Sequence, residues 1–236
     1  EYLADINSMA ETGQSIIEPM QTKSSVINWD DILIQGAQLY RMPLNHEDSV
    51  ETQTVIGPQA AKPMILATPI YISHMSFGAL SKEAKIALAR GSRAMQTAIG
   101  SGEGGILPES KDEAYKYIFE YVPNRYSVTE ENLRAVDAIE IKFGQSAKPG
   151  MGGHLPGNKV TREIARVRGF AEGSDIISPA HYEDILTKEQ LKQKVDWLRD
   201  ISGGKPIGIK IAAGHIEQDL DFALHAKPDF VTLDGR

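Results

Sequence analysis

The sequence has no cysteine among its 236 residues. Disulfide bonds, a thiol nucleophile and cysteine-bound iron–sulfur clusters are therefore excluded within it, and the composition suits a reducing cytoplasm. Positive charge is also scarce, since 25 lysines and arginines face 32 aspartates and glutamates, for a net charge of −7. This balance argues against a protein that coats nucleic acid or an anionic membrane, although a local basic cluster can still bind a small anion.

Long apolar runs are missing as well: no stretch approaches the length needed to span a bilayer, and no signal peptide is recognisable. What remains is an ordinary globular composition, 41% hydrophobic and 24% charged, on a chain long enough for one large domain or two small ones. We therefore predict a cytoplasmic protein without a nucleic-acid or membrane partner. Residues 233–236 form no terminating helix or polar tail, which predicts that the polypeptide continues.

The chain divides by its periodicity. Residues 1–65 are irregular, with weak periodicity and scattered prolines, and are predicted to form an arm or cap on a core. From residue 66 onward, strand-like runs are expected at 69–75, 97–105, 138–144, 175–179, 206–214 and 229–235, and helices at 81–95, 109–122, 129–136, 161–169, 187–201 and 216–226. Strands that alternate with helices are typical of βα units around a parallel sheet.

Two parallel architectures compete for these units. A doubly wound sheet usually has a G-x-G-x-x-G first turn, which "GEGG" at 102–105 does not match. A (β/α)8 barrel instead carries polar residues at many strand ends. Polar or glycine termini occur at His74–Ser76, Ser101–Gly105, Lys142–Gln145, Lys210 and Asp234–Gly235. We therefore predict an α/β fold, a TIM-type barrel whose first six or so units lie in residues 66–236 and which is incomplete at its C-terminus.

A few side chains are unusual for their positions. Lys210 interrupts the apolar run "IGIKIAAG", where it either meets an anion or extends to the barrel mouth. Glu103 lies among glycines that let backbone approach a ligand, or else mark a tight turn. Three arginines share the helix at 161–169, and spacing alone does not say which faces inward. No metal site is predicted, since the remaining histidines lack ligand spacing: His46, His181, His215 and His225.

Several blocks together resemble a known family. The blocks are "MSFGALSKEA" (75–84), "SGEGG" (101–105), "IKFGQSAKPGMGGHLPGNKV" (141–160), "IARVRG" (164–169), "ISP" (177–179) and "IGIKIAAG" (207–214). In this order they resemble the FMN-binding synthase domain of glutamate synthase, with "GMGGHLPG" closest to the archaeal type. The resemblance covers about residues 70–236. It implies an FMN-binding barrel that forms L-glutamate from 2-oxoglutarate and ammonia through 2-iminoglutarate.

The resemblance assigns the cofactor contacts. Met75 and Ser76 lie against the flavin at the end of the first barrel strand. Gln145 offers its amide to the edge of the ring. Lys210 is implied to be both a cofactor-binding and a catalytic residue, because its charge favours the reduced, anionic ring. The FMN phosphate is implied to bind beyond residue 236.

The resemblance also assigns the substrate contacts. Lys148 and Arg168 are implied to bind the carboxylates of 2-oxoglutarate, the lysine as a point charge and the arginine as a planar fork. Glu103 is implied to be catalytic and to contact the substrate nitrogen. His154 is a substrate-binding candidate that departs from the glutamine of bacterial enzymes ("GGQLPG"), and it can titrate near neutral pH.

The family further implies partners outside this segment. These are an electron-donor subunit or ferredoxin, an iron–sulfur cluster, a glutaminase domain or subunit that supplies glutamine-derived ammonia, and assembly into an oligomer. Two alternatives stay open. One is a methylamine–glutamate N-methyltransferase or N-methylglutamate synthase subunit that uses the same pocket. The other is a ligand-binding subunit without independent catalysis.

Overall fold

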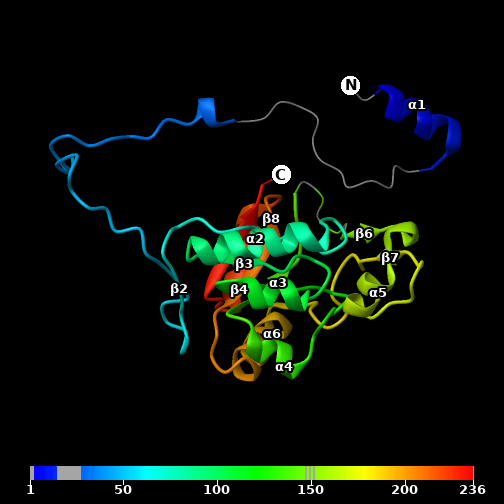
Figure 1. Cartoon of the computed structure of the whole chain (residues 1–236). Helices are drawn as coiled ribbons and strands as arrows, with labels where there is room; N and C mark the ends of the chain where they lie inside the picture. Colours follow the sequence, from blue (N-terminus) through cyan, green and yellow to red (C-terminus); the bar gives the residue numbers. More distant parts are fainter. Residues whose placement is uncertain (1–2, 15–27, 147, 149, 151, 236) are drawn as a thin grey trace. The chain divides into compact units, whose positions relative to one another are not determined.

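A computed structural model describes residues 3–14, 28–146, 148, 150 and 152–235 (Figure 1). Parts of the predicted arm and of the glycine-rich block at 141–160 lie outside these residues. The described chain forms two compact units, residues 3–14 with 28–52 and residues 53–235. The first contains α1 (Leu3–Thr12) and the 3-10 turn η1 (Trp29–Asp31), and no described side chain in it is buried. No helix in the described residues is long and apolar enough to cross a membrane.

A five-stranded parallel sheet forms the centre of the second unit. Its strands are β3 (Ala98–Gly100), β4 (Lys116–Tyr121), β5 (Ala138–Lys142), β8 (Ile207–Ala212) and β9 (Phe230–Asp234). Their order in the sheet is their order in the chain, and every neighbouring pair is parallel. In a doubly wound sheet the order of the strands reverses at a switch point, whereas in a barrel the strands follow one another around the sheet in chain order. The predicted α/β class and barrel-type winding are confirmed in this curled half-barrel sheet.

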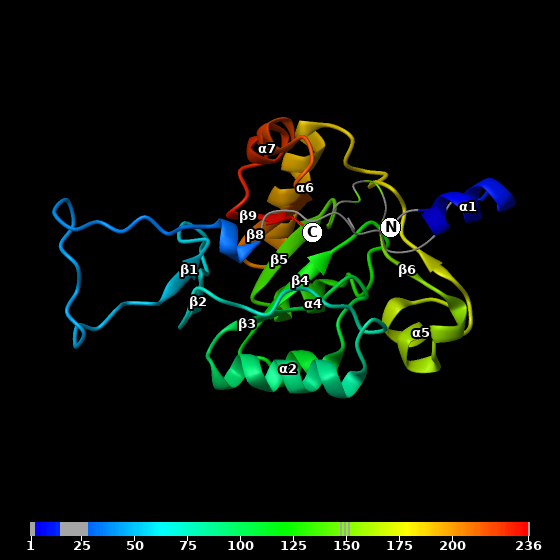
Figure 2. The same ribbon diagram turned by 90° about the horizontal axis from the view of Figure 1, so that it is seen from above.

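Helices connect these strands on the outside of the sheet. They are α2 (Lys82–Ala94), α3 (Pro108–Glu113), α4 (Glu130–Ala135), α5 (Arg162–Arg168), α6 (Lys188–Ile201) and α7 (Ile216–His225). Figure 2 shows α2 beside β3 at one end of the strand order and α6 and α7 beyond β8 at the other. Four helices begin directly after a side chain that accepts a backbone N–H of the first turn: Ser81, Thr129, Thr161 and Thr187.

The predicted helix at 109–122 is wrong in its second half. The helix ends at Glu113, and β4 begins at Lys116. Aromatic residues at every second position, Tyr117, Phe119 and Tyr121, pack on the helix-facing core. This period of two is typical of a strand. Because β4 is buried on both faces, apolar and polar residues do not alternate along it, and the period was missed in the sequence.

Two predicted barrel strands are also wrong. In the run at 175–179 only β7 (Ile176–Ile177) is a strand, and it pairs antiparallel with β6 (His154–Leu155) outside the parallel sheet. The short 3-10 turn η2 (Gly157–Lys159) follows this pair. The backbone of the run at 69–75 pairs with the sheet through a single parallel bridge between Ile72 and Ile99. Two paired residues in the first segment and one bridge in the second thus replace the regular strands that their β-branched composition predicted.

A small hairpin lies under the amino-terminal end of the sheet. Strands β1 (Thr54–Ile56) and β2 (Met64–Leu66) pair antiparallel inside the compact second unit. Met64 and Leu66 are 1% exposed and share an apolar cluster with Ile118 and Ala138. The interior of the half-barrel is therefore apolar at this end, and polar groups are left for the carboxyl ends of the strands.

Candidate active site at the carboxyl ends of the strands

The inner face of the sheet carries charge. Successive side chains of a strand point to opposite faces, so the residues between the helix-facing ones point into the half-barrel. They include Glu120 on β4, Glu140 and Lys142 on β5, and Lys210 on β8. Glu120 lies opposite Glu140, and Lys142 lies opposite Lys210, in the parallel register. All four are buried, and this register brings two carboxylates and two ammonium groups together at one end of the sheet.

Three of these groups, Glu120, Lys142 and Lys210, line a cavity of about 430 Å³. All eight site residues predicted from sequence line it: Met75, Ser76, Glu103, Gln145, Lys148, His154, Arg168 and Lys210. They come from the segment after residue 74, the ends of β3 and β8, the loop that follows β5, strand β6 and helix α5. The volume lies within the range of small-molecule sites, roughly 300 to 1,000 Å³. Residues up to 135 positions apart, from Met75 to Lys210, therefore converge on one space.

Glu103 is the most heavily bonded acid of the cavity, and its side chain is 9% exposed. Its Oε2 accepts a hydrogen bond from Lys142 Nζ. Its Oε1 accepts from the Ser178 hydroxyl and from the backbone N–H of Gly153, the latter at 3.2 Å. A Cβ at Gly153 would lie only 3.1 Å from the carboxylate carbon, so glycine at this position permits the close approach. Three donors therefore hold the carboxylate in one position at the cavity.

Lys210 lies among acids. Its Nζ is 3.4 Å from Glu120 Oε1 and 3.2 Å from Asp234 Oδ2. Burial alone would lower the pKa of Lys210, but the charges of Glu120, Glu140 and Asp234 outweigh burial and raise it. Lys210 is therefore a cation at neutral pH, with an acidic partner on each side.

Lys148 and Arg168 are buried cations of a different kind. Each is at most 7% exposed, and neither forms an ion pair with an acid in the part of the chain that the structure describes. Lys148 Nζ reaches only the carbonyl of Gly152 at 3.4 Å, and one Arg168 nitrogen donates to the carbonyl of Phe77 at 2.9 Å. Burial lowers the pKa of both groups. Two uncompensated buried cations at one cavity make a site for an anion.

The arginine that faces inward is now identified. Arg162 and Arg166 are exposed on α5, whereas Arg168 is buried in the last turn of that helix. Arg168 stacks over the Tyr126 ring at 5.4 Å, and its buried Nε lacks a hydrogen-bond partner among the described residues. Arg168 therefore lines the cavity with one buried donor that has no partner among the described residues.

A buried lysine fixes the wall formed by Met75 and Ser76. Lys85 on α2 is 1% exposed, and its Nζ donates to the carbonyls of Met75 at 2.7 Å and Ser101 at 2.9 Å. Burial lowers the pKa of Lys85 to about 8, despite the charge of Glu120. Lys85 therefore ties the end of the first segment to the loop that carries Glu103.

Gln145 and His154 sit at the rim. Gln145 Oε1 accepts from Lys142 Nζ at 2.5 Å, so its amide is oriented from within the site. His154 Nε2 is 3.9 Å from Asp175 Oδ2 and has no hydrogen-bond partner among the described residues. Asp175 has a 62% exposed side chain, so this pair is weakly coupled. His154 keeps a free nitrogen for a ligand.

Sequence reasoning missed several residues of this site. They are His74, Lys85, Glu120, Glu140, Lys142 and Ser178. Three of them, Glu120, Glu140 and Lys142, carry the same signal that singled out Lys210, a charge inside an apolar strand. Lys85 and Ser178 carry no such signal, because a lysine in a helix and a serine in a loop are ordinary.

A family model and the curated relatives of the chain point to the same family. A family model described as "Conserved region in glutamate synthase" matches residues 8–236. A glutamate synthase large subunit-like protein of Rhizobium meliloti is 39% identical over 99% of the chain and 53% of its own length. An archaeal glutamate synthase [NADPH] of Methanocaldococcus jannaschii is 35% identical over 98% of the chain and 51% of its own length. The chain thus spans about half the length of the curated relatives it matches.

Among solved structures, a mandelate oxidase variant with a C4a-OH-FMN adduct aligns with 77% of the chain and 51% of its own length. It is 17% identical, with a TM-score of 0.45. Another mandelate oxidase complex is 19% identical, with a TM-score of 0.46. Likeness at this distance carries no inference about ligand or reaction.

Proposed function

This chain belongs to the glutamate synthase family, and from that premise we propose that it forms part of an FMN-dependent oxidoreductase that makes L-glutamate. In the proposed reaction 2-oxoglutarate and ammonia condense to 2-iminoglutarate with loss of water. A hydride and a proton then reduce the imine to the amino acid. The FMN cofactor, when bound, supplies the hydride.

One observation carries the proposal. Buried cations without acidic partners, Lys148 and Arg168, share a cavity with an acid-bound cation, Lys210. The first two suit a dicarboxylate substrate. Lys210 suits a ring that gains negative charge on reduction. A simple anion-binding domain would need only the first pair.

The residues present fit a flavin. Gln145 offers an amide that can donate and accept at a ring edge. Lys210 offers a positive charge that its acidic neighbours stabilise. Met75 offers an apolar, polarisable wall against a flat ring, and its backbone is fixed by Lys85. These residues would hold the ring on the inner face of the sheet.

The substrate residues would then act as follows. Lys148 and Arg168 would bind the two carboxylates, and the fork of Arg168 would set the orientation of one of them. The carboxylate of Glu103, aligned by Lys142 and by the Gly153 N–H, would accept a hydrogen bond from the substrate nitrogen and pass protons at that atom. His154 would contact the substrate from the rim. The pocket orients both reactants, which lowers the barrier chiefly through proximity.

The whole protein would need further parts. We propose that electrons come from a pyridine nucleotide or a ferredoxin-type donor through an iron–sulfur cluster, and that a glutaminase domain or subunit supplies ammonia. The described residues contain no cysteine, so the cluster would be bound by another segment or subunit.

The test is direct. The full-length protein should be purified and its absorption spectrum recorded before and after dithionite reduction. We expect a flavin spectrum that bleaches, and glutamate from 2-oxoglutarate and ammonia. N-methylglutamate from methylamine instead would assign a different nitrogen donor. A protein that neither binds FMN nor turns over 2-oxoglutarate would refute the proposal.

A variant tests the role of Lys210 separately. In Lys210→Met we expect FMN affinity to fall about tenfold and the flavin midpoint potential to become more negative, because the reduced ring loses its counter-charge. Lys210→Arg keeps the charge and should retain most of both. Denaturation should be followed in parallel, because the methionine leaves Glu120 without its nearest cation. An unchanged potential and affinity would show that this role is wrong.

A further inference from the structure

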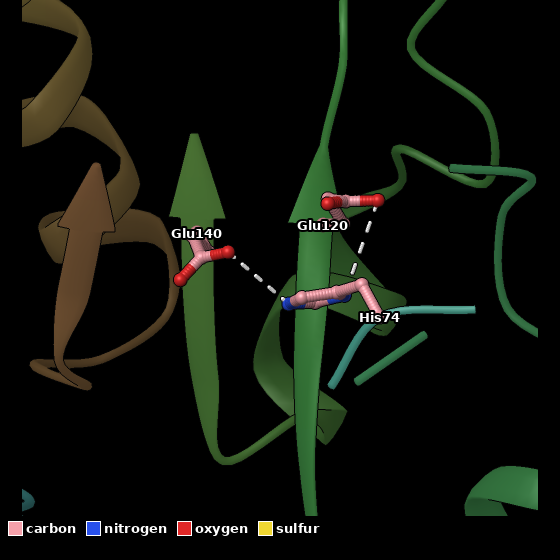
Figure 3. Close-up of side chains that lie close together, drawn as sticks. All are labelled: His74, Glu120 and Glu140. Carbon is pink, nitrogen blue, oxygen red and sulfur yellow. Dashed lines mark ion pairs between the residues drawn. The ribbon is translucent and has the colours of Figure 1, made fainter. Parts of the chain in front are cut away.

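His74 lies between two buried acids at the base of the cavity. Figure 3 shows one imidazole nitrogen directed at Glu140 and the other toward Glu120. His74 Nε2 is 3.3 Å from Glu140 Oε1, and Nδ1 is 4.0 Å from Glu120 Oε2. One ligand atom from each residue lies within 4.8 Å of the others, a spacing that a metal ion could bridge. The side chains are at most 4% exposed.

The protonation of the ring argues against a metal. The backbone N–H of Gly102 donates to His74 Nδ1 at 3.1 Å, so Nδ1 bears the lone pair. A neutral imidazole then carries its single proton on Nε2. The Nε2 atom that carries this proton lies 3.3 Å from Glu140 Oε1, and neither atom has a hydrogen-bond partner among the described residues, which leaves each available to the other. Nδ1 accepts from Gly102 and Nε2 bears the proton, so neither nitrogen has a lone pair left for a cation. A metal would require the loss of the Gly102 hydrogen bond or an imidazolate.

The two acids differ in their partners. Glu120 lies 3.4 Å from Lys210 Nζ and 3.9 Å from Lys142 Nζ. Glu140 accepts a hydrogen bond from the Thr232 hydroxyl at 2.5 Å through Oε2, whereas its Oε1 has no partner among the described residues and lies beside His74. Glu120 thus faces two ammonium groups, and His74 is the group placed to serve the free oxygen of Glu140.

We infer that His74 is a positioning residue: neutral, with its proton on Nε2, it donates to Glu140 and holds that carboxylate on the interior face of the sheet, which also carries Lys210. Glu140 in turn helps to hold Lys210 as a cation. The trio His74–Glu120–Glu140 is then part of an ion-pair network and not a metal site. The role of Lys210 beneath a flavin rests on the proposed function, whereas the protonation of His74 does not.

The environment of the ring supports this assignment. A Cβ at Gly100 would lie 2.5 Å from His74 Nδ1 and 2.6 Å from Cγ, so the ring packs on bare backbone. Burial raises the pKa of Glu140, whereas hydrogen bonds from His74 and Thr232 and the charge of Lys210 lower it. The imidazole ring is therefore held in one position, with the Gly102 N–H at Nδ1 and Glu140 beside Nε2.

The first test needs no variant and no cofactor chemistry. The full-length protein, labelled with nitrogen-15 in histidine, should show by NMR at neutral pH one buried histidine with its proton on Nε2. Loss of this signal in His74→Gln would assign it to His74. A proton on Nδ1, or a doubly protonated ring, would overturn the inference. So would one equivalent of tightly bound Zn²⁺ or Mn²⁺ that is lost in Glu140→Gln.

The second test measures the pKa of Lys210 in variants of the network. Lys210 Nζ should titrate at a lower pH in Glu140→Gln and in His74→Leu, whereas His74→Gln, which keeps a donor and an acceptor, should restore most of the wild-type value. His225→Gln, on the exposed end of α7, is the matched control and should change nothing. An unshifted Lys210 in both Glu140→Gln and His74→Leu would refute the network.

FMN binding distinguishes this inference from the proposed function. In His74→Leu we expect about tenfold weaker FMN binding with folding retained. A wild-type protein that binds no FMN would refute the proposed function and leave the NMR result standing. A wild-type protein that binds FMN but has the wrong His74 tautomer would refute only the inference.

Discussion

The two faces of the parallel sheet obey different rules. Toward the helices, every second residue of β4, β5 and β8 is apolar, and the side chains pack on α4, α6 and α7. Toward the interior, the alternate positions carry Glu120, Glu140, Lys142 and Lys210, all buried. The helix-facing side contributes stability through the burial of apolar surface. The interior side holds buried charges, which are tolerated because cations and carboxylates are paired. A single strand can therefore serve stability and chemistry at alternating positions.

The largest expected effect lies on the helix-facing side. Phe119→Ala removes a fully buried ring from the core and should lower the free energy of unfolding by about 4 kcal/mol. Urea denaturation measures this. Phe170→Ala, at a ring 39% exposed, should cost under about 1 kcal/mol. Similar losses at both positions would break the distinction between core face and surface.

Lys85 connects the two regions, because it lies on helix α2 and its ammonium group bonds to backbone at the carboxyl ends of the strands. Its pKa in the folded state is about 8, against an ordinary 10.5, so between these values the unfolded state binds more protons. The stability of the wild type should therefore rise with pH across this window, by up to roughly 3 kcal/mol from this group. Urea midpoints of wild type and Lys85→Met at pH 7.5 to 10 measure the difference. Parallel pH profiles would contradict the assignment.

On the interior side the expected effects are on binding. Arg168→Gln should raise the KM for 2-oxoglutarate roughly thirtyfold, about 2 kcal/mol, through the loss of a charged hydrogen-bond donor. Arg166→Gln, two residues away on the exposed face of α5, should leave the KM unchanged. Steady-state kinetics of both variants measures this. Equal effects would show that burial does not identify the substrate arginine.

Thr232→Val gives the smallest effect. Its hydroxyl donates to Glu140 on the interior face, and its loss should lower stability by about 1 kcal/mol, far less than the loss of Phe119. Thr232→Ser keeps the hydroxyl and should recover most of it. Denaturation of both variants tests this, and a loss comparable to that of Phe119→Ala would show that the polar face carries as much stability as the core face.

The sequence predicted much of this arrangement. Helices with clear periodicity, such as α2 and α6, lie within the predicted ranges 81–95 and 187–201. The cavity residues were found because family motifs and glycines mark the carboxyl ends of strands. Lys210 was found by charge in an apolar run, a signal that depends only on the cost of burying charge.

The errors have physical causes. The strand β4 was read as helix because its two faces are both buried, so no polar alternation marks its period. β7 was read as a barrel strand because two isoleucines look alike in any sheet, and only the pairing with His154 and Leu155 shows that the ribbon is antiparallel. The sequence marked His74 only as a polar strand end, since its contacts depend on Gly102 and Glu140, which are distant in sequence.

The hairpin β1–β2 has a consequence for engineering. Because Met64 and Leu66 fill the amino-terminal end of the interior, that end contributes packing alone, and the reactive groups gather at the opposite end. The two ends can therefore be redesigned separately. Apolar substitutions around Ile118 and Ala138 would tune thermal tolerance, while specificity could be altered at the rim around His154 without disturbing the base on which the fold rests.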